Sequence, residues 1–196
     1  MDTGQWFTSR DGSSWWFDSG SLSLDFAYTG SMAKNPAWEQ LHSPGDLGGW
    51  LSGRFERLDA VDSEGELRDA RGLRAAIGTI ANCLVYGTSP STDDVDTINL
   101  FAALPNIPPS LSGGSRRAGR NSVRAGQAFS TIARDAIALF ESISEGRLRE
   151  CAADNCGLIF YDESRSNNRR WCSMQRCGNR SKVRAHRARA GGGGQP

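Results

Sequence analysis

Four cysteines near the end of the chain have the type and spacing of a metal site. Cys151 and Cys156 form one close pair, and Cys172 and Cys177 form a second pair with the same interval. Zinc takes four thiolates in a tetrahedron, and each close pair can wrap one edge of the ion. Because four cysteines leave no coordination position open, the sequence predicts one structural Zn2+ and no catalytic metal.

The same spacing is compatible with two disulfides or with four separate buried thiols. The paired arrangement favours the metal in a cytosolic protein, where thiols stay reduced. Gly157 supports the metal, since a glycine directly after a ligand lets the backbone turn sharply. The fifth cysteine, Cys83, falls in an apolar helical pattern and is interpreted as a small core residue.

The elements that must position the ligands are two strands and a helix. The apolar run over residues 158–161 predicts a strand after the first pair, with residues 169–172 as its expected partner. Ser173 can cap a last helix over about residues 174–189. Cys177 would then lie in the first turn and hold this helix against the metal.

Positive charge is concentrated in the same part of the chain. Residues 147–196 hold eleven Lys and Arg against four Asp and Glu, whereas residues 1–146 hold twelve against eighteen. A basic module on an acidic body indicates a polyanion as partner of the module. On the predicted last helix, steps of three and four residues place four arginines in one stripe. These are Arg176, Arg180, Arg184 and Arg187.

This stripe predicts a nucleic-acid-binding face, because arginine donates in pairs to phosphates and guanine edges. DNA is preferred over RNA, since a helix fits the major groove of B-form DNA. Stacking of Phe160, Tyr161 and Trp171 on unpaired bases would instead favour RNA. A solvated basic face, or docking on the acidic body, is the plainer alternative. The predicted nucleic-acid-binding set is Arg165, Arg169, Arg170, Arg176, Asn179, Arg180, Lys182, Arg184 and Arg187.

Two stretches of the chain resemble known families. Trp171-Cys172-Ser173-Met174 leading into Cys177-Gly178-Asn179-Arg180 is similar to the CGNR zinc finger. Upstream, Leu22 to Thr29 resembles the opening motif of the ABATE domain, Leu-Asp-Phe-x-Asn-Thr, with Tyr28 at the position of the Asn. The resemblance implies a bacterial, stress-induced transcription regulator with an N-terminal ABATE domain.

The chain therefore divides into three parts. Residues 1–146 are expected to form a regulatory domain that is mainly α with a small β element. Residues 147–190 should form an α+β zinc finger with two cysteine knuckles and a basic terminal helix. Residues 191–196 read as a flexible tail. The two folded parts follow each other with almost no linker, which favours fixed packing over free tethering.

The N-terminal domain begins with a predicted hairpin over residues 6–17, with Asp11-Gly12 as its turn. Its aromatic residues are expected to cover a small core or, alternatively, to line a pocket for an apolar effector. Residues 22–26 alternate apolar and polar as a half-buried strand would, although the segment could also open a helix. Asp25 is interpreted as a packing or capping carboxylate. The candidate pocket residues are Trp6, Trp15, Trp16, Phe17 and Phe26.

Helices should make up the rest of this domain. Ser43 is expected to cap a helix that ends near Arg57. Ser63 and Glu66 form a capping box for an amphipathic helix that Gly87 ends. Two further helices are predicted, one capped by Thr92 and stopped by Pro105, and one carrying Phe129 and ending near Ser144. Residues 105–121 between them are predicted to be irregular.

The function that these features favour is a zinc-binding transcription regulator whose finger binds DNA and whose N-terminal domain senses a ligand or self-associates. The alternatives are a zinc-stabilised module that docks an acidic protein or RNA polymerase, and an RNA-binding protein. A homodimer is compatible with one short finger per chain. An enzyme is disfavoured, because the two histidines, His42 and His186, are far apart and no phosphate-binding glycine loop or nucleophile elbow is present.

The chain also carries no segment that predicts a membrane. It has no apolar run of membrane-spanning length, and its start lacks the basic and apolar regions of a secretion signal. A cytoplasmic protein is therefore expected.

Overall fold

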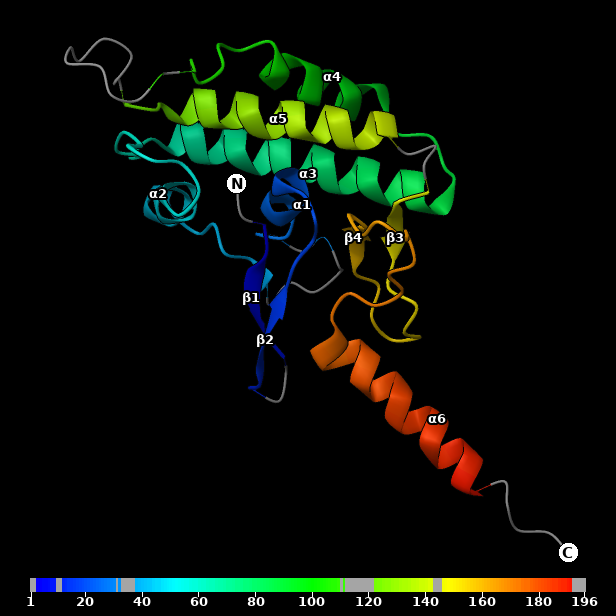
Figure 1. The fold of residues 1–196 in the computed structure, drawn as a ribbon. Helices are drawn as coiled ribbons and strands as arrows, with labels where there is room; N and C mark the ends of the chain where they lie inside the picture. Colours follow the sequence, from blue (N-terminus) through cyan, green and yellow to red (C-terminus); the bar gives the residue numbers. More distant parts are fainter. Residues whose placement is uncertain are drawn as a thin grey trace, which may run out of the picture.

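A layer of long helices, a small hairpin and a zinc-finger region make up the protein, and the last helix projects away from all of them (Figure 1). The structure is a computed structural model. It describes residues 3–9, 12–30, 32, 38–109, 111, 122–142 and 146–191. In these residues no helix is long and apolar enough to cross a membrane.

The N-terminal hairpin is confirmed. Strand β1 (Gln5–Thr8) pairs antiparallel with β2 (Ser14–Phe17), so that Phe7 faces Trp15 and Trp6 faces Trp16. Alternation sends Phe7, Trp15 and Phe17 into the protein and leaves Trp6 and Trp16 exposed. Asp11 of the predicted turn lies outside the described residues.

Residues 22–27 form helix α1 (Leu22–Ala27), so the strand interpretation is wrong and the alternative is right. The Ser21 side chain caps the helix by accepting from the backbone of Leu24. All of α1 is buried, because it lies at the centre of the molecule against α3 (Glu64–Tyr86) and α5 (Ala125–Glu141). Its polar residues are satisfied there: Asp25 accepts hydrogen bonds from the Ser19 hydroxyl and the Gly4 amide.

Helix α2 (Pro44–Ser52) begins where predicted and ends early. Ser43 and Asp46 form its capping box, and Pro44 occupies the first turn. The predicted end near Arg57 is wrong because Arg57 has a positive φ of 59°, which a helix cannot contain, and the next residue, Leu58, bridges to Val123.

Helices α3, α4 (Thr92–Ala102) and α5 form the helical layer in Figure 1. The Ser63 side chain caps α3 by accepting from the amides of Gly65 and Glu66, which is half of the predicted capping box, and Gly87 ends the helix in the left-handed conformation, as predicted. Ser91, rather than Thr92, caps α4 by accepting from the amide of Asp94. The expected end of α5 near Ser144 lies outside the described residues. So do residues 112–121 of the segment predicted to be irregular.

The finger's sheet differs from the prediction. Strand β4 (Ile159–Tyr161) pairs antiparallel with β3 (Leu148–Glu150), not with residues 169–172. Residues 169–172 lie beside the first knuckle instead, where the Arg170 carbonyl accepts a hydrogen bond from the Ala152 amide at 2.9 Å. Residues before the first cysteine therefore supply the second strand.

The last helix begins with a wide turn. The segment η3 (Met174–Gly178) contains Cys177, and α6 (Asn179–Gly191) continues from it. The Ser173 carbonyl accepts from the amides of both Cys177 and Gly178 at 3.0 Å. The Ser173 side chain makes no capping bond, so its predicted side-chain cap is wrong. The predicted tail beyond Gly191 lies outside the described residues.

The finger is packed on the N-terminal part, as expected from the missing linker. One buried cluster joins Phe7, Trp15, Phe17 and Tyr28 to the finger's apolar residues and cysteines. A second joins Leu24, Ala81 and Leu139 to Leu148 and Ile159. Only the largest cluster, built from α1 to α5 and their connections, belongs to the N-terminal part alone.

Candidate zinc centre and basic helix

The four predicted ligands meet at one point. The Sγ atoms of Cys151, Cys156, Cys172 and Cys177 all lie within 4.8 Å of one another, and none of the cysteines forms a disulfide. The Cys156 and Cys172 sulfurs are 3.5 Å apart. Tetrahedral zinc with Zn–S bonds of about 2.3 Å requires sulfurs about 3.8 Å apart, so the cluster has the size of a four-thiolate zinc site.

The electrostatics of the cluster also favour a cation. Hydrogen bonding from neighbouring thiols lowers the pKa of Cys151 to about 2, whereas the neighbouring Cys151 raises the pKa of Cys172. Crowded thiols thus hold one thiolate easily and resist further ionisation. A divalent ion removes this conflict, because it binds the deprotonated form of every ligand. These four cysteines therefore form a single structural zinc site.

Short elements hold the ligands in place. Strands β3 and β4 bracket the first knuckle, where Gly157 takes a φ of +70° directly after Cys156. The Cys172 amide lies 3.3 Å from the Cys151 sulfur and donates to it, which links the two knuckles. The wide turn of η3 then brings Cys177 to the cluster at the base of α6.

Tyr28 ties the N-terminal part to this centre. It is fully buried among Phe7, Phe17 and the finger, and its hydroxyl donates to the Ile159 carbonyl while accepting from the Ile159 amide. Burial raises the pKa of Tyr28 well above its usual value, so the hydroxyl stays neutral. The sequence showed that a tyrosine replaces the motif's Asn, but its partner on β4 lies far along the chain.

Gly20 allows the close approach of these two parts. It has a φ of +76°, and a Cβ at this position would collide with the Tyr161 carbonyl. Next to it, the Tyr161 amide donates to the Ser19 carbonyl at 2.8 Å. The segment before α1 and strand β4 are therefore in contact backbone to backbone.

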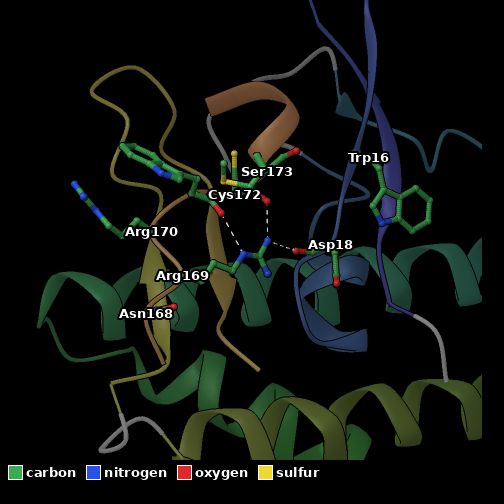
Figure 2. A pocket seen from close by; sticks show the side chains of 9 residues that line it. Trp16, Asp18, Asn168, Arg169, Arg170, Cys172 and Ser173 are labelled. Atoms are coloured by element: carbon green, nitrogen blue, oxygen red, sulfur yellow. Dashed lines mark hydrogen bonds between the residues drawn. The ribbon is translucent and has the colours of Figure 1, made fainter. Parts of the chain in front are cut away.

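Arg169, a predicted nucleic-acid contact, is occupied within the protein. Its Nη2 donates to the carbonyls of Asp18 and Cys172 at 2.7 and 2.6 Å, and its Nε donates to the Trp171 carbonyl. The guanidinium also stacks 4.2 Å from the centre of the Phe160 ring. Figure 2 shows it bridging the hairpin side and the knuckle. Arg169 thus braces the finger.

Arg176 is also turned inward. Its guanidinium lies 4.5 Å from the centre of the Trp15 ring, and its Nε is buried without a hydrogen-bond partner in the described chain. The predicted stripe therefore loses its first member, because the wide turn of η3 rotates Arg176 toward the hairpin. This contact joins Trp15 of the hairpin to the base of α6.

Arg149 and Asp162 are structural residues that the sequence did not single out. Arg149 donates to the Asn167 side chain and carbonyl, and lies 3.8 Å from the Asp162 carboxylate. Asp162 is fully buried and accepts from the amides of Ser164 and Arg169. In the sequence these residues belong to a polar stretch, and a polar stretch does not show which side chains will contact one another.

The remaining predicted contacts face solvent. Every residue from Lys182 to Arg189 is exposed, as are Arg180, Asn179, Arg170 and Arg165. Within the described chain only Arg184 of these has an ion-pair partner, Asp154 at 3.1 Å. Arg170 stacks 5.1 Å from the centre of the Trp171 ring. Of the three aromatics considered for base stacking, Phe160 is fully buried and Tyr161 is half-buried, whereas Trp171 lines two cavities.

The five aromatics proposed for an effector pocket lie in different parts of the structure. Trp15 and Phe17 pack in the cluster around the cysteines, while Phe26 belongs to the helical core. Trp6 and Trp16 lie on the outer face of the hairpin. Strand alternation thus separates neighbouring rings of the hairpin onto opposite faces, and an effector pocket formed by these residues stays a prediction.

Comparison with known families matches both parts of the chain. Residues 20–142 match the ABATE family, described as "Putative stress-induced transcription regulator", and residues 147–190 match the CGNR zinc finger. No curated protein matches the chain. The hairpin that packs on the zinc centre lies before the first matched region.

Proposed function

The chain belongs to the ABATE family of transcription regulators and carries a zinc-containing CGNR finger, and we propose that helix α6 of this finger binds duplex DNA. The observation that carries the proposal is the exposure of α6. It projects from the body with its basic residues unburied, and its C-terminal end is the part farthest from the helical layer (Figure 1).

The composition of α6 calls for a polyanionic partner. It carries Arg180, Lys182, Arg184, Arg187 and Arg189 and no acidic residue. A helix that is polar on all sides gains nothing from packing on its own protein, and like charges at four-residue steps destabilise it by about 0.2–0.5 kcal/mol per pair. Phosphates would neutralise these charges and release counterions.

The dimensions of α6 suit the major groove. Its thirteen residues span about 20 Å at 1.5 Å per residue, and a groove about 12 Å wide admits one helix. Asn179 and Arg180 at its start are exposed side chains of the types that pair with adenine and guanine. The zinc site fixes this end, so α6 is presented at a constant angle.

A small cavity beside the first knuckle supplies a seat for a phosphate. It has a volume of about 230 Å³ and is lined in part by Arg170, Arg180, Arg184 and Asp154. The exposed pair of Arg184 with Asp154 holds one arginine in place until a phosphate replaces the carboxylate. Exposed pairs of this kind are weak, so the exchange is easy.

The N-terminal part has a regulatory role in this proposal, by sensing a ligand or by association of two chains. The support is its shared core with the finger: Tyr28 and the hairpin contact the segments that hold the zinc ligands. A change in the hairpin would therefore reach the base of α6. A dimer would bring two helices to successive turns of DNA.

The test is the affinity of the zinc-loaded full chain for duplex DNA when Arg180→Ala and Arg187→Ala are combined. We expect affinity to fall tenfold or more, with zinc content and circular dichroism unchanged, because both side chains are exposed. Arg68→Ala is the matched control, since Arg68 is an exposed arginine on α3. Its affinity should equal that of the unchanged protein.

Equal affinity of the double variant and the control would contradict DNA binding by α6. Binding to an acidic protein or RNA polymerase would then be the better reading of the basic surface. If duplex affinity falls but RNA hairpins bind tighter than duplex DNA, the preference for DNA is wrong while the surface stands.

A further inference from the structure

A second cavity lies where the hairpin meets the finger. It has a volume of about 480 Å³, within the range of small-molecule sites, and Figure 2 shows it from close by. Its lining comes from both parts of the protein: Trp16 and Asp18 from the hairpin side, and residues 168–174 from the finger. In Figure 2 Trp16 and Asp18 lie across from Arg170 and Asn168, with Arg169 between them.

The aromatic part of the lining is partly exposed to solvent. Trp16 is 40 % exposed, and its indole lies against the backbone of Gly4 and makes an edge contact with Trp6 at 5.6 Å. One face of the Trp16 indole is therefore available to a planar group that enters the cavity. Such faces stack on nucleobases whatever their sequence, because every base has a π-face.

The polar part of the lining has unused hydrogen-bonding groups. The Asn168 amide and the Ser173 hydroxyl make no hydrogen bond to any described residue. Asp18 uses Oδ1 to accept from Thr3 and from the Gly20 amide, which leaves Oδ2 free to accept from a ligand. A carboxylate oxygen selects a ligand with an amino group.

The charged part of the lining favours an anion at the rim. Arg170 is exposed and has no ion-pair partner among the residues the structure describes, although it stacks on Trp171. The Asp18 carboxylate is the only acidic group of the cavity, and Arg169 beside it donates to the Asp18 carbonyl. A ligand could stack a planar ring on Trp16 and place a phosphate beside the guanidinium of Arg170.

We propose that this cavity binds an unpaired nucleotide, with the base stacked on Trp16 and the phosphate held by Arg170. Asp18 accepts from an exocyclic amino group, so adenine, cytosine and guanine are preferred over uracil and thymine. The site shares Arg170 with the phosphate seat beside the first knuckle, but it does not depend on α6, because Trp16 and Asp18 lie on the hairpin side. A free nucleotide and one residue of a single strand have this same chemistry.

The probes are AMP, UMP, adenosine, and eight-residue strands of deoxyadenosine or thymidine, titrated calorimetrically into the zinc-loaded full chain. We expect AMP to bind more tightly than UMP. Trp16→Ala should weaken AMP about fivefold or more, which is the lower end for loss of one stacked base. Arg170→Gln should weaken AMP but leave adenosine unchanged.

Trp6→Ala is the matched control, since Trp6 is the neighbouring exposed tryptophan and does not line the cavity. AMP affinity should not change in it. A per-site affinity higher for the deoxyadenosine strand than for AMP identifies single strands as the source, and the reverse identifies a free nucleotide.

Absence of AMP and strand binding would overturn the proposal, as would equal losses in Trp16→Ala and Trp6→Ala. Duplex affinity, measured on the same Trp16→Ala protein, separates the two proposals. It should be retained, because Trp16 is not part of α6. If Trp16→Ala loses nucleotide binding and keeps duplex binding, the nucleotide binds in the cavity and the duplex binds elsewhere.

Discussion

Arg169 and Arg187 belong to the same finger and have opposite environments. Arg169 donates to three backbone carbonyls and stacks on Phe160, whereas Arg187 is exposed on α6. Arg149 resembles the first, Arg176 shares only its packing on an aromatic ring, and Arg180 resembles the second. One group builds the finger and the other is left for a partner.

What separates the groups is the supply of acceptors around them. The spacer and the knuckles have few regular hydrogen bonds, so their carbonyls need donors, and arginine offers five in a planar fork. Helix α6 satisfies its own carbonyls and has no such need. A count of positive charge therefore overstates the surface that is free to bind nucleic acid.

The largest expected effect tests whether the packed group depends on zinc. Cys172→Ser should release the metal and unfold the finger, since structural zinc contributes about 10–16 kcal/mol to folding in finger peptides. The hairpin should loosen too, because Trp15 and Phe17 share the cluster of the cysteines, while α3 and α5 stay helical. Zinc content reports release of the metal, near-ultraviolet circular dichroism reports loosening of the aromatic hairpin, and far-ultraviolet circular dichroism reports the helices.

Cys83→Ser is the control for this variant, since Cys83 lies outside the cluster. It should keep the metal and both spectra. Full zinc content in Cys172→Ser, or a hairpin spectrum unaffected by metal loss, would contradict the shared core.

An intermediate effect is expected for the packed arginine itself. Arg169→Ala should lower the free energy of unfolding by about 3 kcal/mol, because it leaves the carbonyls of Asp18 and Cys172 without their donor. Arg165→Ala, four residues earlier and exposed, should change it by less than about 0.5 kcal/mol. Urea unfolding measures both, and equal values would erase the distinction between the groups.

The smallest effect concerns Arg184, the α6 arginine that forms an ion pair with Asp154. Asp154→Asn should release Arg184 and tighten duplex binding by no more than about fivefold, since an exposed pair is weak. Glu163→Gln is the control, because Glu163 is an exposed carboxylate of the spacer, whereas Asp162 beside it is buried. Duplex affinity should not change in it. Weaker binding by Asp154→Asn would mean that the carboxylate positions Arg184.

The sequence predicted what depends on neighbours in the chain. The cysteine pairs, the hairpin and helix α3 with its caps follow local rules of spacing, alternation and capping. The partner of β4 could not be predicted in this way, because the choice between Leu148–Glu150 and residues 169–172 depends on the fold of the knuckle. Arg169 and Arg187 are likewise indistinguishable until their surroundings are known.

The contact of Tyr28 with β4 has the same explanation. The tyrosine replaces the Asn of its motif, yet only the packing of α1 on the finger shows that its hydroxyl serves Ile159. The same packing makes a cavity from Trp16 and residues 168–174, which no local pattern connects.

The most direct test of DNA binding by α6 is a salt titration of the zinc-loaded full chain against random-sequence duplex DNA, beside a chelated sample. We expect the logarithm of affinity to fall with the logarithm of salt concentration at a slope of about −3 or steeper, since several exposed cations contact phosphates. The chelated sample should lose this binding. A slope near zero, or a steep slope that survives chelation, would contradict a zinc-held helix that binds phosphates.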